Sequence, residues 1–385
     1  MDRVHTKTGN AKSPLRIAHQ GYFYVGGRYG SAADGGVFQS GQMYVEYQIP
    51  ARLGANRGGR LTRHPLVFIH GGGHTGACWQ MTPDGRPGWP DFFLGRGWPV
   101  YVVDQPGRGR SPVNTGAYGP LSDAPSVRKA QNNWAASEKS PASERPQWPQ
   151  AGLHRRWPGG TAPGDPVFDQ YYAHLAPGIV SQDEQENATT DALVELLDRI
   201  GPAVLVGHSQ PGPALWRVAD LRPELVRGIV AVEPTGPPFF ERGKDGEGVE
   251  MDRPYGVCRG KLTFDPPLRD ASELQLVRQP QPDGPGLAAC WLQAEPARKL
   301  SRLAGRPILF LLSESSYHAP YDHCTALFLK QAGVDNEFVR LTDLGIHGNG
   351  HLMLIENNSL ELADWVERWL VKRLTTPRRK KTESN

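Results

Sequence analysis

A short apolar stretch that runs into a serine between glycines constrains the fold of this chain more than any other feature. Residues 204–212 read Val-Leu-Val-Gly-His-Ser-Gln-Pro-Gly, and a helical pattern follows over 213–220. A strand, a sharp turn and a helix in this order raise a serine hydroxyl above the edge of a parallel sheet for nucleophilic attack. Gly207 and Gly212 supply the small neighbours that a strained turn needs. Pro211 stands where the usual pattern has its second glycine, so an ordinary strand-to-helix turn is the alternative.

Three glycines after a second apolar strand predict hydrogen-bond donors for an oxyanion. Residues 65–76 read Pro-Leu-Val-Phe-Ile-His-Gly-Gly-Gly-His-Thr-Gly. The tetrahedral intermediate of acyl transfer needs backbone N–H groups aimed at its oxyanion, and glycines let the main chain come close to it. We expect the amides of Gly72 (or Gly73) and of Gln210, which follows Ser209, to form the oxyanion hole. A phosphate-binding loop is disfavoured, because no Lys-Ser/Thr follows and the Gly-x-Gly-x-x-Gly spacing is absent.

Two histidines near the C-terminus compete for the role of general base. Residues 344–353 read Leu-Gly-Ile-His-Gly-Asn-Gly-His-Leu-Met and follow a strand-like stretch at 337–341. We favour His351, because it follows a glycine-rich turn and opens the last helix, whereas His347 suits a capping or surface position. Three further histidines lie next to the proposed site in sequence, and we interpret them as packing or loop-fixing residues: His70, His74 and His208.

The carboxylate that would orient the imidazole has three candidates. A strand over 227–232 ends in Glu233, at the same sheet edge as Ser209, and a carboxylate there can hold the histidine in the correct tautomer. The more frequent position for this acid follows the next strand, at 307–312, where Glu314 and then Asp322 occur. We favour Glu233 and keep both others as alternatives, since each carboxylate could also lie in solvent.

Several short motifs taken together resemble a small group of bacterial and fungal esterase-like α/β-hydrolases. The motifs are Gly-Tyr-Phe-Tyr-Val-Gly-Gly at 21–27, Gln-Met-Tyr-Val-Glu-Tyr-Gln-Ile-Pro at 42–50, Thr-Pro-Asp-Gly-Arg at 82–86, Asp-Gln-Pro-Gly-Arg-Gly-Arg-Ser at 104–111, His-Ser-Gln at 208–210, Val-Glu-Pro at 232–234 and His-Gly-Asn-Gly-His at 347–351. In that group the acid is a glutamate after the sixth strand, so the resemblance implies Glu233, with His351 as base. It also implies oxyanion donors at Gly72 and Gln210, and it supplies no substrate.

The alternation of strand and helix patterns predicts one α/β domain over residues 1–385, built on a mostly parallel, doubly wound sheet. Continuous apolar runs at 66–69, 100–103, 203–206, 229–232 and 307–312 suit strands that are buried on both faces. Two alternating runs within 21–48 predict an antiparallel hairpin that begins the sheet. Taken with the resemblance, this pattern implies the α/β-hydrolase fold with cap or lid insertions.

Two long inserts are expected to shape the binding site. A lid-like insert spans 113–182, and a cap insert spans 235–305, with a helix expected over 290–303. Loops of this length usually serve as lids or binding loops. We predict an aromatic-walled pocket for a bulky acyl or alcohol group, with Trp79, Phe239 and Phe240 as substrate-binding residues. The aromatic rings of the inserts could instead only fix the long loops in place.

Charge and cysteine content point to a cytoplasmic protein without nucleic-acid or membrane partners. The formal net charge is +3, and no apolar run is long enough to span a bilayer. Residues 1–20 lack the apolar core of a secretory signal. The four scattered cysteines form no C-x-x-C pair, so we expect reduced thiols, with a Cys258–Cys290 bridge as the alternative. The basic residues of 375–385 are expected to form a disordered tail.

We therefore predict a serine hydrolase that cleaves a carboxylic ester or lactone of a small molecule through an acyl-enzyme on Ser209. His351 would act as base and Glu233 as its orienting acid, with no metal and no organic cofactor. A lyase, isomerase or carbon–carbon hydrolase on the same scaffold is one rival, because a fold does not fix the reaction. A binding protein with a decayed site is another, and an intact serine, histidine and glycine loop disfavour it. The sequence leaves the oligomeric state open, although the apolar hairpin and cap would suit a homodimer.

Overall fold

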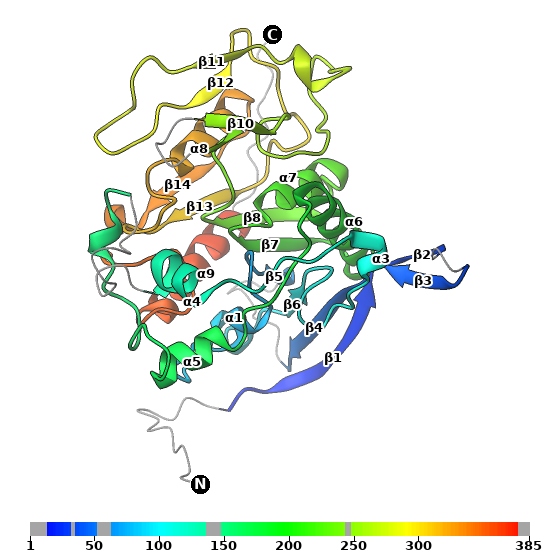
Figure 1. Cartoon of the computed structure of the whole chain (residues 1–385), viewed down its shortest axis with the longest axis vertical. Helices are drawn as coiled ribbons and strands as arrows, with labels where there is room; N and C mark the ends of the chain where they lie inside the picture. Colours follow the sequence, from blue (N-terminus) through cyan, green and yellow to red (C-terminus); the bar gives the residue numbers. More distant parts are fainter. Residues whose placement is uncertain (1–13, 32–34, 52–62, 136–147, 243–247, 376–385) are drawn as a thin grey trace.

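An eight-stranded sheet with the neighbour order β1-β4-β6-β5-β7-β8-β13-β14 forms the centre of the protein (Figure 1). The structure is a computed structural model that describes residues 14–31, 35–51, 63–135, 148–242 and 248–375. The strands of the sheet are β1 (Ile17–Val25), β4 (Met43–Pro50), β5 (Leu66–Ile69), β6 (Val100–Asp104), β7 (Ala203–His208), β8 (Val226–Val232), β13 (Ile308–Leu312) and β14 (Glu337–Arg340).

The sheet is parallel except at its beginning. Strand β4 pairs antiparallel with both β1 and β6, and all other neighbouring strands run parallel. Every residue of β5, β7 and β13 is buried, as expected from their continuous apolar runs. Along the chain, a small hairpin of β2 (Arg28–Ser31) and β3 (Val37–Ser40) connects β1 to β4. The predicted α/β-hydrolase fold class is confirmed.

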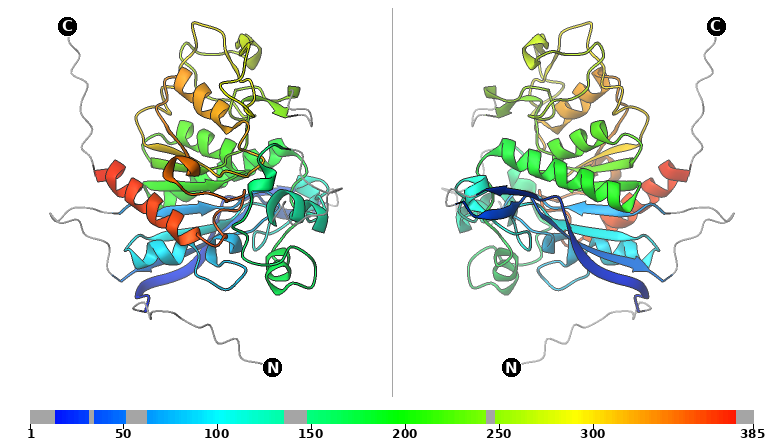
Figure 2. Two further views of the ribbon diagram at one scale, coloured as in Figure 1. Left: turned by 90° about the vertical axis from the view of Figure 1, so that its left-hand side faces the viewer. Right: turned by 90° about the vertical axis from the view of Figure 1, so that its right-hand side faces the viewer.

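Helices cover both faces of the sheet and create two apolar cores. One core joins the sheet to α6 (Gln182–Ile200), α7 (Gly212–Leu221) and α8 (Asp322–Gln331), and the other joins it to α2 (Trp89–Gly95) and α9 (Ser359–Thr375) (Figure 2). Side chains along a strand alternate between the cores: Leu205 belongs to the first, and Val204 and Val206 belong to the second. This layering places the carboxyl ends of β5, β7, β8 and β13 along one edge.

The two inserts contain short elements joined by long loops. The described part of 113–182 holds α3 (Thr115–Tyr118), α4 (Val127–Ala130), the π-helical turn η1 (Gln131–Ala135), the 3₁₀ turn η4 (Ala151–Leu153) and α5 (Pro166–Tyr172). The described part of 235–305 holds two antiparallel pairs, β9 (Phe239–Arg242) with β10 (Gly248–Arg253) and β11 (Leu276–Arg278) with β12 (Trp291–Gln293), besides the 3₁₀ turn η5 (Ala271–Glu273).

The helix expected over 290–303 does not form, because β12 begins at Trp291 and Pro296 interrupts the segment that follows. Proline lacks the N–H group that a helix interior requires. Within the part of the chain that the structure describes, no helix is both long and apolar enough to cross a membrane. Most of the predicted disordered tail, residues 376–385, lies outside the described residues.

A disulfide between Cys290 and Cys324 links the cap insert to α8. The two Cα atoms are 5.1 Å apart, and Cys78 and Cys258 are free and buried. The prediction of four reduced thiols is therefore wrong, and so is the alternative Cys258–Cys290 pairing. The sequence does not reveal this contact, because it depends on β12 packing beside α8, where Gln331 accepts a hydrogen bond from the Gln293 amide. The bridge also argues against the predicted cytoplasmic location, since disulfides are rare there.

Removing this disulfide should destabilise the protein measurably. The bridge closes a loop with a sequence separation of 34 residues, so replacing both cysteines by serine should lower the free energy of unfolding by about 2–4 kcal/mol in urea titrations. Alkylation of the unfolded, unreduced chain should modify Cys78 and Cys258, and prior reduction should expose all four thiols. Four alkylated cysteines without reductant would contradict the bridge.

Candidate active site

Ser209 lies on a strained turn between β7 and α7. Its φ is +63°, a value that non-glycine residues rarely adopt and that recurs at functional sites. The turn is so tightly packed that its two glycines have no room for a side chain. A Cβ on Gly207 would lie 2.7 Å from Leu215, and one on Gly212 would lie 2.7 Å from Pro234. Pro211 replaces the usual glycine without conflict, since its φ is −71°.

A buried histidine–glutamate pair lies beside this serine. Nδ1 of His351 donates a hydrogen bond of 2.5 Å to Oε2 of Glu233, and both side chains are almost inaccessible to solvent. Glu233 follows β8 directly and has a φ of +45°, a value that non-glycine residues rarely adopt. This hydrogen bond fixes which ring nitrogen carries the proton, and so it leaves Nε2 of His351 as the acceptor.

Two serines after β13 complete the hydrogen bonding of the Glu233 carboxylate. The amide and the hydroxyl of Ser313 donate to Oε1 at 2.8 and 2.5 Å, and the hydroxyl of Ser316 donates to Oε2 at 2.6 Å. A buried carboxylate is costly unless its oxygens are satisfied in this way. Neither serine was predicted from the sequence, although the run Ser-Glu-Ser-Ser-Tyr-His at 313–318 follows a strand at the correct sheet edge.

The other two candidate acids are paired elsewhere. Glu314 accepts hydrogen bonds from Nδ1 of His347 at 3.0 Å and from the Gly348 amide at 2.7 Å. Asp322 accepts one from Nδ1 of His318 at 2.9 Å. The structure therefore brings His351 together with Glu233 and gives His347 a partner of its own on the surface.

Burial shifts the protonation of both members of the pair. It raises the pKa of Glu233 to about 7, and the neighbouring His318 and the two serines oppose this rise. Burial, together with His318, holds the pKa of His351 well below its usual value. The rings of His318 and His351 are stacked with centroids 4.7 Å apart. At neutral pH the imidazole is therefore uncharged and free to accept a proton.

The glycine loop after β5 packs directly against the serine turn. A Cβ on Gly71 would lie 3.1 Å from the Cβ of Ser209, and one on Gly72 would lie 3.5 Å from the Gln210 side chain. Nδ1 of His74 donates to the Gly72 carbonyl at 2.8 Å and so fixes the loop. The amides of Gly72 and Gln210, the predicted oxyanion donors, thus belong to segments in contact.

His70 and His208 also fix the backbone around the serine. Nε2 of His70 accepts a hydrogen bond from the Gln105 amide at 3.0 Å, and Nε2 of His208 donates to the His351 carbonyl at 2.9 Å. These contacts agree with their interpretation as packing and loop-fixing residues.

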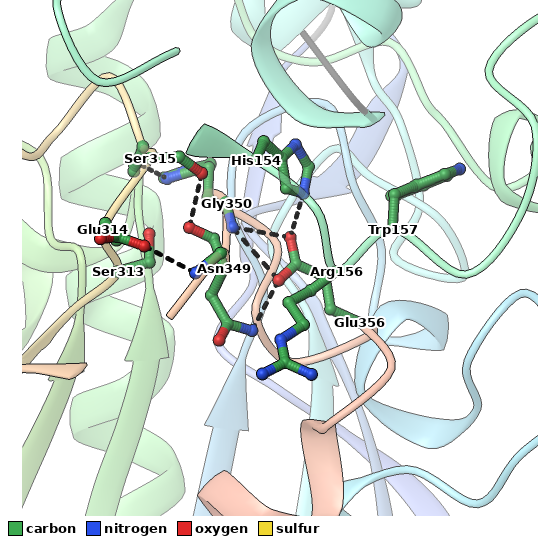
Figure 3. A network of polar contacts seen from close by, with 12 residues as sticks. His154, Arg156, Trp157, Ser313, Glu314, Ser315, Asn349, Gly350 and Glu356 are labelled. Atoms are coloured by element: carbon green, nitrogen blue, oxygen red, sulfur yellow. Dashed lines mark hydrogen bonds and ion pairs between the residues drawn. The ribbon is translucent and has the colours of Figure 1, made fainter. Parts of the chain in front are cut away.

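A second buried carboxylate, Glu356, holds the segment that carries His351 (Figure 3). It accepts hydrogen bonds from His154 at 2.8 Å, from the Asn349 side chain at 2.7 Å and from the Gly350 amide at 2.9 Å. A Cβ on Gly350 would lie 2.8 Å from the His154 ring, so a larger residue would not fit there. His351 therefore follows a rigid turn, and the last helix begins only at Ser359 instead of at His351 as expected.

The lid-like insert contributes to this support. His154 belongs to 113–182, and the amides of Arg155 and Arg156 donate to the Gly348 carbonyl at 2.9 and 3.1 Å. Arg156 also donates through Nε to the His347 carbonyl at 2.9 Å. In the described residues this insert thus acts as a brace for the histidine turn, a role that the sequence did not reveal.

A cavity of about 610 Å³ opens beside Ser209. Much of its wall is polar, and its lining residues are Lys129, Trp148, Gln182, Ser209, Thr235, Gly236, Glu241, Asp252, Arg253, Arg259, Tyr317, His318 and Tyr321. Residues of both inserts, 113–182 and 235–305, contribute to this wall.

The three aromatic residues predicted to bind substrate lie outside this wall, which corrects that prediction. Trp79 is fully buried against Phe68, and Phe239 is fully buried against Phe328. Phe240 is partly buried and packs on Trp291 in the cap insert. These rings fill the cores because apolar burial there is more favourable than exposure to a polar cavity.

The group best placed to hold a metal ion is occupied by the disulfide. Ligand atoms of Cys290, His323 and Cys324 lie within 4.8 Å of one another in the described part of the chain. A cysteine binds a metal ion as its thiolate, and the sulfurs of Cys290 and Cys324 are joined to each other instead. This group is separate from the residues around Ser209.

A strained serine beside a buried histidine–glutamate pair, above the edge of a parallel sheet, is the arrangement of a hydrolase with a nucleophile elbow. The chain belongs to the alpha/beta hydrolase family, whose model matches residues 66–365. A relative named probable secreted lipase phiG, from a fungus (Fungal sp., strain ATCC 74256), is 40% identical over 373 residues, which is 96% of this chain and 95% of the relative. The solved structure of a novel bacterial esterase covers 96% of this chain and 100% of its own at 23% identity, with a TM-score of 0.65.

Substituting Glu233 should show whether this carboxylate, and not another candidate, orients His351. Glu233→Gln keeps the size of the side chain but removes the charge that stabilises a protonated His351, so labelling by a fluorophosphonate probe should slow by on the order of 10⁴-fold. Glu314→Gln is the matched control, because its carboxylate contacts His347 instead, and it should label at close to wild-type speed. Rapid labelling of Glu233→Gln would assign the acid to another residue.

Proposed function

We propose that the protein is a serine hydrolase that cleaves a carboxylic ester or lactone of a small molecule. The observation that carries this proposal is the 2.5 Å hydrogen bond from His351 to Glu233 beside a serine in a strained turn. The names of the fungal relative and of the bacterial esterase support ester bonds as the target. A lactone is an internal ester, so the same chemistry would open it.

The reaction would proceed through an acyl-enzyme. Ser209 Oγ attacks the carbonyl carbon as its proton passes toward Nε2 of His351, and Glu233 stabilises the imidazolium that forms. The amides of Gly72 and Gln210 stabilise the oxyanion, and loss of one such donor typically costs about 3 kcal/mol of barrier. His351 then protonates the leaving alcohol, and a water activated by the same histidine releases the acid. Each step uses side chains and amides of this chain.

The disulfide supports a site of action in an oxidising compartment. Cys290 and Cys324 form a bridge that a reducing cytosol would not favour. The fungal relative is named a probable secreted protein, which agrees with this proposal.

Intact mass after fluorophosphonate treatment tests the proposed function. Wild-type protein should gain one adduct, because the probe phosphonylates an activated serine. Ser209→Ala should gain none, and the exposed Ser301→Ala is the matched control that should label like wild type. An unlabelled wild-type protein, or an adduct that persists in Ser209→Ala, would contradict an acyl-enzyme on this residue.

A further inference from the structure

The hydroxyl of Tyr317 contacts the imidazole that would accept the serine proton. It is 3.1 Å from Nε2 of His351, and it lines the same cavity as Ser209, whose side chain acts to lower the pKa of Tyr317. Nε2 is the nitrogen left as acceptor once Nδ1 donates to Glu233. In the described part of the chain, Nε2 of His351 accepts a hydrogen bond from Tyr317 and forms none with Ser209.

The surrounding residues fix the Tyr317 ring in this position. It packs against the rings of His318 and His351, with centroids 4.6 Å away in both cases, and against Trp148 at 5.9 Å. The preceding residue, Ser316, is held by the Glu233 carboxylate at 2.6 Å. The contact with Nε2 is therefore built into the same segment that satisfies the buried acid.

The protonation state of the hydroxyl suits a group that both donates and accepts. Burial and the nearby Glu233 charge raise the pKa of Tyr317 well above its usual value, so the phenol keeps its proton at neutral pH. A phenol oxygen can accept one hydrogen bond while its own O–H donates another. Tyr317 can thus accept from Ser209 and donate to His351 at the same time.

We propose that Tyr317 is a further catalytic residue, which relays the proton between Ser209 and His351; this inference rests on the proposed function. As Ser209 Oγ forms its bond to the carbonyl carbon, the carbonyl π pair moves to oxygen. The Ser209 proton passes to the Tyr317 oxygen, and the Tyr317 proton passes to Nε2 of His351. Tyr317 ends with one proton as it began, His351 becomes imidazolium, and the substrate carries the oxyanion.

The contrasting account is that Tyr317 only occupies Nε2 in the resting enzyme and moves aside when substrate binds. A relay requires the hydroxyl, so its removal slows acylation. An occluding hydroxyl competes with Ser209 for the same nitrogen, so its removal leaves the rate unchanged or raises it. The sign of the effect therefore distinguishes the two.

The test compares fluorophosphonate labelling rates of wild type, Tyr317→Phe and Tyr101→Phe. Tyr317→Phe keeps the ring and its packing, and it should label at least about 100-fold more slowly, the usual minimum contribution of a positioned proton-transfer group. Tyr101→Phe is the matched control, because this partly buried tyrosine stacks on Tyr47 in the sheet, and it should label like wild type. Labelling of Tyr317→Phe at wild-type speed or faster would overturn the relay.

A proton inventory of the wild-type rate, measured in mixtures of light and heavy water, gives a second test. If two protons move in the transition state, the wild-type rate should be a curved function of the deuterium fraction. Tyr317→Phe should transfer only one proton and should therefore give a straight line. A straight line for the wild-type protein would overturn the relay, and this outcome does not depend on the variant. Thermal melting would show whether Tyr317→Phe is folded. Wild-type protein that does not label at all would refute the proposed function and the relay with it, whereas normal wild-type labelling with a fast variant would refute the relay alone.

Discussion

The hydrogen bond between His351 and the fully buried carboxylate of Glu233 is the interaction on which the rest of the site depends. A lone buried carboxylate would be strongly destabilising, and it would take up a proton to avoid that cost. The hydroxyls of Ser313 and Ser316, the Ser313 amide and the imidazole N–H together satisfy both of its oxygens. These hydrogen bonds offset the cost of burying the Glu233 carboxylate. The hydrogen bond that the carboxylate accepts from Nδ1 keeps the imidazole of His351 oriented.

The parallel sheet and the inserts together bring these groups close to one another. The serine follows β7, the glutamate follows β8, the two serines follow β13 and the glycine loop follows β5, so four adjacent strands deliver the site at one edge. His351 comes from a turn outside the sheet and needs separate support, which Glu356 and the 113–182 insert provide. The insert therefore positions the imidazole as well as lining the cavity.

Much of the sheet and the residues around the serine could be predicted because their signals are local. Apolar runs of four to six residues predict strands that are buried on both faces. The serine turn and the glycine loop can each be recognised from a few consecutive residues. The choice of Glu233 over Glu314 rested on strand position and resemblance, and the structure pairs it with His351.

The features that were missed depend on contacts between distant segments. The Cys290–Cys324 bridge, the bracing of Gly350 by His154 and the core packing of Trp79 and Phe239 are decided by how the inserts fold onto the sheet. A loop aromatic has the same composition signal whether it lines a cavity or fills a core. Tyr317 had no sequence signal of its own beyond its place after β13.

The pH dependence of the fluorophosphonate labelling rate tests the central claim most directly. Burial raises the pKa of Glu233 to about 7 and keeps that of His351 well below its usual value, so the pair takes up one proton as the pH falls through about 7. The protonated pair cannot accept the serine proton, and the labelling rate should therefore fall below pH 7, in step with that single protonation. A rate that stays constant down to about pH 5, where an ordinary glutamate is still ionised, would contradict a buried Glu233–His351 pair as the activating group.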